Sequence, residues 1–91
     1  MLNLIWRESA LDEFDEIAAY VAARNPAAAE HLQSTIEASA ERIAERPFMH
    51  RPGRAPGTRE AVVHPNYIIV YRVTAEAVEI LNVLHARQRY P

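Results

Sequence analysis

The sequence predicts an α+β domain in which a helical hairpin packs on one face of a small, mainly antiparallel sheet, in the order β-α-α-β-β-β. Two amphipathic helical patterns, joined at Asn25-Pro26, follow a short apolar segment at the N-terminus. Three segments rich in β-branched and aromatic residues come next, separated by short turns. Because short turns join antiparallel strands and a short connection joins antiparallel helices, these patterns together predict this fold class.

The length and composition limit the chain to one domain over residues 1–91. A chain of 10.3 kDa buries enough surface for one core but not for a second lobe. Cysteine is absent, which excludes disulfides and thiolate metal sites. No apolar run reaches the roughly 20 residues that span a bilayer, and the N-terminus does not resemble a signal peptide. We therefore expect a cytoplasmic protein without membrane contact.

The first half of the chain carries the opening strand and the first helix. Residues 2–6 are rich in apolar side chains, with Leu2, Leu4 and Trp6 on one face, which predicts a strand. Ser9 is predicted to cap the first helix, because Asp12 three residues later completes a capping box. The apolar stripe of this helix comprises Leu11, Phe14, Ala18 and Val21.

The second helix is predicted from Pro26 to about Glu45. Asn25 is a favoured N-cap residue and proline suits the first helical position. Pro47 ends the helix. The apolar stripe comprises Ala29, Leu32, Ile36, Ala40 and Ile43.

The second half contains an irregular loop followed by three strands. The loop, residues 46–57, holds three prolines and both glycines. Strands are predicted over residues 58–63, 67–74 and 77–84, and a short cationic tail follows them.

The last two predicted strands are apolar on both faces. Strict alternation places Tyr67, Ile69, Tyr71 and Val73 opposite Ile68 and Val70, and it places Val78, Ile80 and Leu84 opposite Leu81 and Val83. One helical hairpin can cover only one face, so something else must cover part of the other. The cover is the tail with the 46–57 loop, a second copy, or a partner chain.

Charge is distributed unevenly along the chain. Residues 1–45 contain three Arg and nine acidic residues, a net charge of −6, whereas residues 46–91 contain seven Arg and three acidic residues, a net charge of +4. The cationic side chains that the strands and tail could bring together are Arg59, Arg72, His85, Arg87 and Arg89. Such a set could bind phosphates, and His85 could then act as an acid or base in RNA cleavage. It could equally bind acidic protein side chains, or Arg59 and Arg72 could form cross-strand ion pairs with Glu60 and Glu79.

Three segments, taken in order, resemble the ParE/RelE toxin superfamily, and more narrowly its ParE branch of plasmid stabilisation toxins. They are Gly57–Glu60, Tyr67–Val73 and Val78–Arg87. The resemblance implies the toxin of a type II toxin–antitoxin pair. Its partner would be a ParD-like antitoxin whose ribbon-helix-helix part binds operator DNA and whose C-terminal segment wraps the toxin. The sequence contains no His-x-x-x-His or His-Glu-x-x-His pair, so we expect no metal, and we expect no cofactor. The apolar residues expected to bind the antitoxin are Phe14, Tyr67, Ile69, Tyr71 and Ile80.

The two branches of this superfamily differ in target. ParE-like toxins bind DNA gyrase, whereas RelE-like toxins cut mRNA on the ribosome. Arg59 and Arg87 match arginine positions of the RelE-type cleft, but its lysines have no counterpart here and Tyr90 arrives early for its late tyrosine. The resemblance therefore favours a gyrase-binding toxin with no catalytic residue, whose target-binding candidates are Arg59, Arg72, His85, Arg87, Arg89 and Tyr90. The alternatives are a ribosome-dependent endonuclease using Arg59, His85 and Arg87, and a toxin fold that has lost toxicity.

Overall fold

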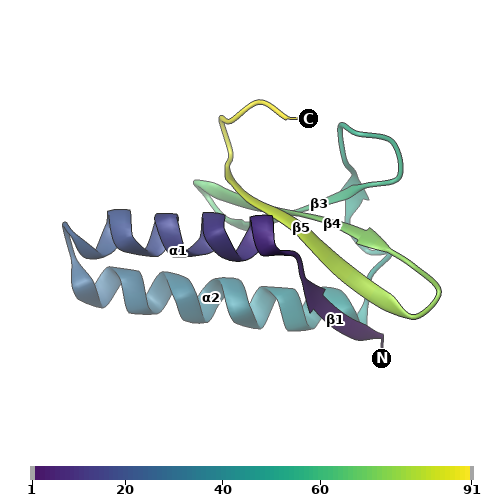
Figure 1. Ribbon diagram of the computed structural model, residues 1–91, viewed down its shortest axis with the longest axis horizontal. Helices are drawn as coiled ribbons and strands as arrows, with labels where there is room; N and C mark the ends of the chain where they lie inside the picture. The colour runs from purple at the N-terminus through teal and green to yellow at the C-terminus, as the bar shows by residue number, and fades with distance from the viewer. Residues whose placement is uncertain (1, 91) are drawn as a thin grey trace.

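Two helices pack against one face of a five-stranded mixed sheet, which confirms the predicted fold class (Figure 1). The structure is a computed structural model and describes residues 2–90. Its elements are β1 (Asn3–Trp6), α1 (Glu8–Ala22), α2 (Pro26–Glu45), β2 (Arg51–Pro52), β3 (Arg59–His64), β4 (Tyr67–Val73) and β5 (Ala77–His85). None of the helices within the described residues is long and apolar enough to cross a membrane.

The strands lie in the order β1-β5-β4-β3-β2. β1 pairs in parallel with β5, with Leu4 opposite Val78, and every other neighbouring pair is antiparallel. The two-residue strand β2 falls inside the segment that was predicted to be irregular. Its pairing with β3 places Arg51 opposite Glu60, and this contact becomes important for the site.

The start of α1 differs from the prediction. The helix begins at Glu8, and its N-cap position is Arg7, whose side chain makes no capping hydrogen bond. The Arg7 backbone N–H donates to the Ile80 carbonyl at 2.9 Å, so strand pairing continues to the residue before the helix. Ser9 therefore lies within the first turn, and its hydroxyl donates to the Leu81 carbonyl at 2.9 Å. The predicted Ser9 cap is wrong because β5 takes up that hydroxyl.

The core-facing stripe of α1 agrees with the prediction at Phe14 and Val21 but not at Leu11. Leu11 is exposed, whereas Ala10 is fully buried in the core and Phe14, Ile17 and Val21 pack against it. In α2 both features are as predicted. The Asn25 side chain accepts a hydrogen bond from the Ala28 backbone N–H at 3.1 Å, and the whole predicted stripe from Ala29 to Ile43 is buried.

A β-bulge in β5 overturns the predicted alternation of this strand. Val70 lies opposite Asn82 but Tyr71 lies opposite Ile80, so Leu81 has no counterpart on β4. An extra residue in one strand reverses the faces of the side chains beyond it. Val83 consequently joins the core under the helices, and Leu84 turns to the other face.

The face away from the helices is covered by the chain's own tail. There Ile68, Val70 and Leu84 form a small buried cluster, against which Ala86 and Tyr90 pack. The tail, yellow in Figure 1, rises from the end of β5 on the side of the sheet away from α2. The sequence left three possible covers for this face, and in the structure the tail covers it.

Candidate functional site

Arg72 forms a cross-strand ion pair. It lies opposite Glu79 in the β4–β5 ladder, and its Nη2 and Nε lie 2.6 and 2.9 Å from Glu79 Oε1. Arg7 approaches the other carboxylate oxygen at 3.6 Å. The cross-strand ion pair between Arg72 and Glu79 is therefore confirmed, and the Arg72 guanidinium is already paired with a carboxylate.

Arg59 has different partners from those considered for it. It makes no ion pair with Glu60 but donates from Nη1 to the His50 backbone carbonyl at 2.9 Å. Its guanidinium carbon lies 5.1 Å from the centre of the Phe48 ring, within cation–π range. Arg59 thus holds the segment that follows α2.

A buried carboxylate, Glu60, lies at the centre of the cationic half of the chain. Only 4% of its surface is exposed. Arg51 Nε lies 2.8 Å from Oε1, Arg54 Nε lies 3.5 Å from Oε2, and the Tyr90 hydroxyl donates to Oε2. Two guanidinium groups and a hydroxyl offset the cost of burying this charge. Sequence reasoning missed Arg51 and Arg54, although an Arg-rich loop without acidic residues next to a strand carboxylate was a usable signal.

Arg54 also binds the tail directly. Its Nη1 donates to the Gln88 carbonyl and its backbone N–H donates to the Tyr90 hydroxyl oxygen, both at 3.2 Å. Its guanidinium carbon lies 4.8 Å from the centre of the Tyr90 ring. We call residues 86–90 the C-terminal strap, because these contacts fasten them over the outer face of the sheet. Arg89 lines a cavity of about 330 Å³ beneath the strap.

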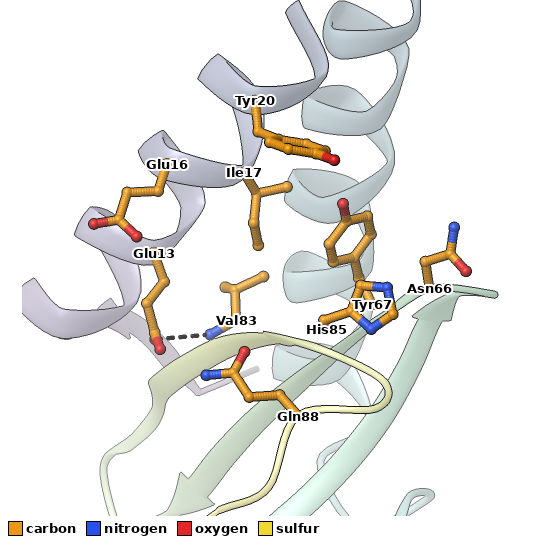
Figure 2. A pocket seen from close by; sticks show the side chains of 9 residues that line it. All are labelled: Glu13, Glu16, Ile17, Tyr20, Asn66, Tyr67, Val83, His85 and Gln88. Carbon is orange, nitrogen blue, oxygen red and sulfur yellow. Dashed lines mark hydrogen bonds between the residues drawn. The ribbon is translucent and has the colours of Figure 1, made fainter.

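His85 lies elsewhere, in an open groove of about 660 Å³ between α1 and the end of the sheet (Figure 2). Its ring meets the Tyr67 ring edge-on, with centroids 5.6 Å apart. Its Nδ1 accepts a hydrogen bond from the Arg87 backbone N–H at 3.1 Å. The residues lining the groove are Glu13, Glu16, Ile17, Tyr20, Asn66, Tyr67, Val83, His85 and Gln88.

The side chains proposed for RNA cleavage are not brought together. Arg59 lies opposite Tyr71 and His85 lies opposite Tyr67, at positions four residues apart on β4. At roughly 3.3 Å per residue, the two positions are about 13 Å apart along the direction of β4. Arg87 is exposed in the turn after β5. A general acid and a phosphate-binding cation must both reach one reacting group, so this arrangement does not form a single active site.

Burial shifts two pKa values near Arg59. Burial lowers the pKa of His50 below its usual 6.5, and the positive charge of Arg59 lowers it further. Burial raises the pKa of Tyr71 above its usual 10.0, while Arg59 acts in the opposite direction. The Tyr71 hydroxyl donates to the Pro47 carbonyl, so these shifts accompany a structural contact. Within residues 2–90 no three His, Asp or Glu side chains are grouped so that they could hold a metal ion.

Comparison with known proteins gives the family. The model of the family described as "ParE toxin of type II toxin-antitoxin system, parDE" matches residues 4–90. The chain belongs to the ParE toxin family. Y4kP of Sinorhizobium fredii is 42% identical over 87 residues, which are 94% of this chain and 90% of that protein. Toxin RelE2 of Caulobacter vibrioides is 33% identical over 86 residues, 94% of this chain and 97% of that protein.

Solved structures share the fold at lower sequence identity. The chromosomal ParDE system of P. aeruginosa contains a chain that superposes with a TM-score of 0.83 at 20% identity, covering 93% of this ParE-family chain and 96% of that one. The YoeB/ParE toxin of Agrobacterium tumefaciens gives a TM-score of 0.67 at 18% identity, covering 98% of this chain and all of that one. These likenesses concern the fold alone.

The apolar residues expected to bind the antitoxin do not form an open surface in this ParE-family toxin. Ile69, Tyr71 and Ile80 are fully buried in the core beneath the helices. Phe14 is partly buried and stacks on Trp6, with ring centroids 5.5 Å apart. Tyr67 alone of the five lines the open groove. Because α1 and α2 fill the face that carries Ile69, Tyr71 and Ile80, these three side chains are not accessible to a partner in this structure.

Proposed function

We propose that this ParE-family toxin acts by binding DNA gyrase in the cytoplasm and catalyses no reaction itself. The separation of Arg59 from His85 is the observation that favours binding over RNA cleavage. The match to the ParE family over residues 4–90 favours gyrase over the ribosome as the target. Among the target-contacting candidates, Arg87 and Arg89 are exposed and make no ion pair within the described residues.

We further propose that a ParD-like antitoxin neutralises the toxin and binds operator DNA through a ribbon-helix-helix part. The structure of similar fold from P. aeruginosa is a chromosomal ParDE system, which supports a partner of this kind. The toxin would then reach operator DNA only through the antitoxin.

A supercoiling assay with purified bacterial gyrase tests the proposed target. Wild-type protein is expected to inhibit supercoiling at micromolar concentration with accumulation of cleaved DNA. Arg87→Ala is expected to weaken the inhibition. Arg24→Ala is the matched control, because Arg24 is also exposed but lies over Tyr20 at the far end of the helical hairpin.

The same protein preparation tests the alternative target. Cleavage of mRNA in the A site of programmed ribosomes, without any effect on gyrase, would replace the proposed function with ribosome-dependent endonuclease activity. His85→Ala would then be the informative variant, because His85 is the one proton-transfer candidate in that scheme.

A further inference from the structure

Two large apolar side chains protrude next to each other after α2. Phe48 is 66% exposed and Met49 is 69% exposed. Both lie in the segment between α2 and β2, in the half of the chain that carries the positive charge. Isolated exposed apolar residues need no explanation, but adjacent large ones are typical of surfaces that bind another protein.

Two contacts hold the backbone on either side of these residues, and two more involve the Phe48 and Met49 side chains themselves. The Tyr71 hydroxyl donates a hydrogen bond to the Pro47 carbonyl from the core side, and Arg59 donates one to the His50 carbonyl at 2.9 Å. The Arg59 guanidinium lies over the Phe48 ring, and Arg46 Nη1 lies 3.8 Å from the Met49 sulfur. Side chains that are already ordered lose little conformational entropy on binding, so these contacts prepare the segment to bind a partner.

A cavity of about 260 Å³ lies beside Phe48. It is lined by Phe48, Pro52, Gly57, Thr58, Arg59 and Val73. The apolar part of this lining can receive a large apolar side chain from a partner, while Phe48 and Met49 contact the partner's surface. Such paired apolar anchors supply most of the binding energy in protein interfaces.

The charge around the cavity determines the partner's chemistry. Residues 46–59 contain four Arg and no acidic residue. Arg51 and Arg54 are paired with the buried Glu60, whereas Arg46 and Arg59 form no ion pair within residues 2–90. A partner seated here must neutralise two guanidinium groups, and carboxylates do so with paired hydrogen bonds.

We propose that Phe48, Met49 and this cavity, with Arg59 in its lining and Arg46 beside Met49, bind an acidic segment of the antitoxin that carries a large apolar side chain. We name these four residues and the cavity the Phe48 surface. The inference rests on the proposed function, since it requires a neutralising antitoxin. A segment seated on the Phe48 surface would cover Arg59, a target-binding candidate, and would thereby compete with the target.

The double variant Phe48→Ala/Met49→Ala tests the proposal by titration against the full-length antitoxin encoded with this chain. We expect the dissociation constant to rise at least about 30-fold, the effect of losing one or more central anchors. Val62→Ala is the matched control, because Val62 is 60% exposed on β3 and does not line the cavity. It is expected to bind like the wild type. Circular dichroism and thermal unfolding verify that the variants fold, as expected for exposed side chains.

A charge variant gives an independent measurement on the same surface. Arg46→Glu is expected to weaken antitoxin binding, and raising the salt concentration from 0.1 to 0.5 M is expected to weaken the wild-type complex more than the Arg46→Glu complex. Equal salt sensitivity of both complexes would count against a role of Arg46.

The outcomes separate this inference from the proposed function. Antitoxin affinity that is unchanged in the double variant overturns the inference and leaves the proposed function standing. Loss of gyrase inhibition with intact antitoxin affinity assigns the Phe48 surface to the target and also overturns it. Failure of wild-type protein to bind the antitoxin overturns the inference together with the proposed antitoxin partner, whereas the gyrase target is decided separately by the supercoiling assay.

Discussion

The Tyr90 hydroxyl donates a hydrogen bond to Oε2 of Glu60, thirty residues earlier in the chain. This contact joins the C-terminal strap to β3, and Arg51 and Arg54 bind the same carboxylate. The strap thereby closes over the outer-face cluster around Val70. A buried charge therefore organises the cover of a sheet face that the helical hairpin cannot reach.

Tyr90→Phe should loosen the strap without changing the ring that packs on the outer face. Hydrogen bonds to charged groups contribute about 1.5–3 kcal/mol, so the free energy of unfolding is expected to fall by up to that amount. Urea unfolding measures the loss, and hydrogen exchange at the Ala86 amide, which donates to the Asn66 carbonyl, reports local opening. Tyr20→Phe is the control, since Tyr20 is exposed on α1. Equal stability of both variants and the wild type would contradict a structural role for the hydroxyl.

Glu60→Gln should lower the free energy of unfolding more than Glu79→Gln does. Glu60 is nearly buried between two arginines, so its neutralisation is expected to cost about 1–3 kcal/mol. The Glu79 side chain is 17% exposed and its arginine partners are about half exposed, so its loss should cost under about 1 kcal/mol. Denaturant unfolding of the two variants in parallel gives the comparison. A larger cost at Glu79 would refute the assignment of Glu60 as the central charge of the outer face.

Glu13→Ala should destabilise the bulge of β5. Oε1 of Glu13 accepts hydrogen bonds from the Asn82 side chain at 3.0 Å and from the Val83 backbone N–H at 3.2 Å (Figure 2 shows the latter). β1 ends at Trp6, so this side chain takes the place of a neighbouring strand. An unsatisfied buried N–H costs about 1–3 kcal/mol.

The Glu13 prediction has two matched variants. Glu13→Gln keeps a side-chain oxygen acceptor and should retain most of the stability, while Glu16→Ala removes an exposed carboxylate one turn away and should be close to neutral. Hydrogen exchange at the Val83 amide distinguishes the three. Fast exchange in Glu16→Ala but not in Glu13→Ala would be incompatible with this contact.

The stability of the segment after α2 should depend on pH through His50. Its pKa is lowered in the folded protein by burial and by Arg59, so the unfolded chain binds the proton more readily. The contribution of neutral His50 is therefore present above pH 6.5 and is lost as pH falls through the lowered pKa. His50→Gln removes this dependence but keeps the backbone carbonyl that binds Arg59.

Thermal unfolding between pH 5 and 7.5 tests the His50 prediction. The difference in stability between wild type and His50→Gln should shift in favour of the wild type as pH rises. If the stabilities of wild type and His50→Gln change in parallel with pH over this range, His50 titrates alike in the folded and unfolded chains, which would contradict the prediction.

Local patterns were sufficient to predict the fold class, the helical hairpin and the second-helix cap. Asn25 caps through atoms three residues away, so its role depends on nearby sequence alone. Ser9 had an equally good local pattern, but its hydroxyl bonds to Leu81, 72 residues away. A capping prediction fails where a distant strand competes for the same side chain.

The site was harder to predict than the fold. Arg72 pairs with Glu79 across a tight β4–β5 connection, so the pairing was foreseeable from strand spacing. Arg59 and His85 were expected to lie close together on neighbouring strands, but they pair with β4 at positions four residues apart. Register sets such distances, and register depends on the bulge and on turn geometry.

The sequence by itself determined the order of the elements other than β2, the buried stripe of α2 and the separation of charge between the two halves, because each depends on residues close together in the chain. Only the tertiary structure decided that Leu81 forms a bulge, which moves Val83 into the core and Leu84 to the outer face. It also decided that Tyr90 and two loop arginines meet at Glu60. The physical reason is that buried polar groups must be hydrogen-bonded, and which partners lie within reach depends on the packing of the whole chain.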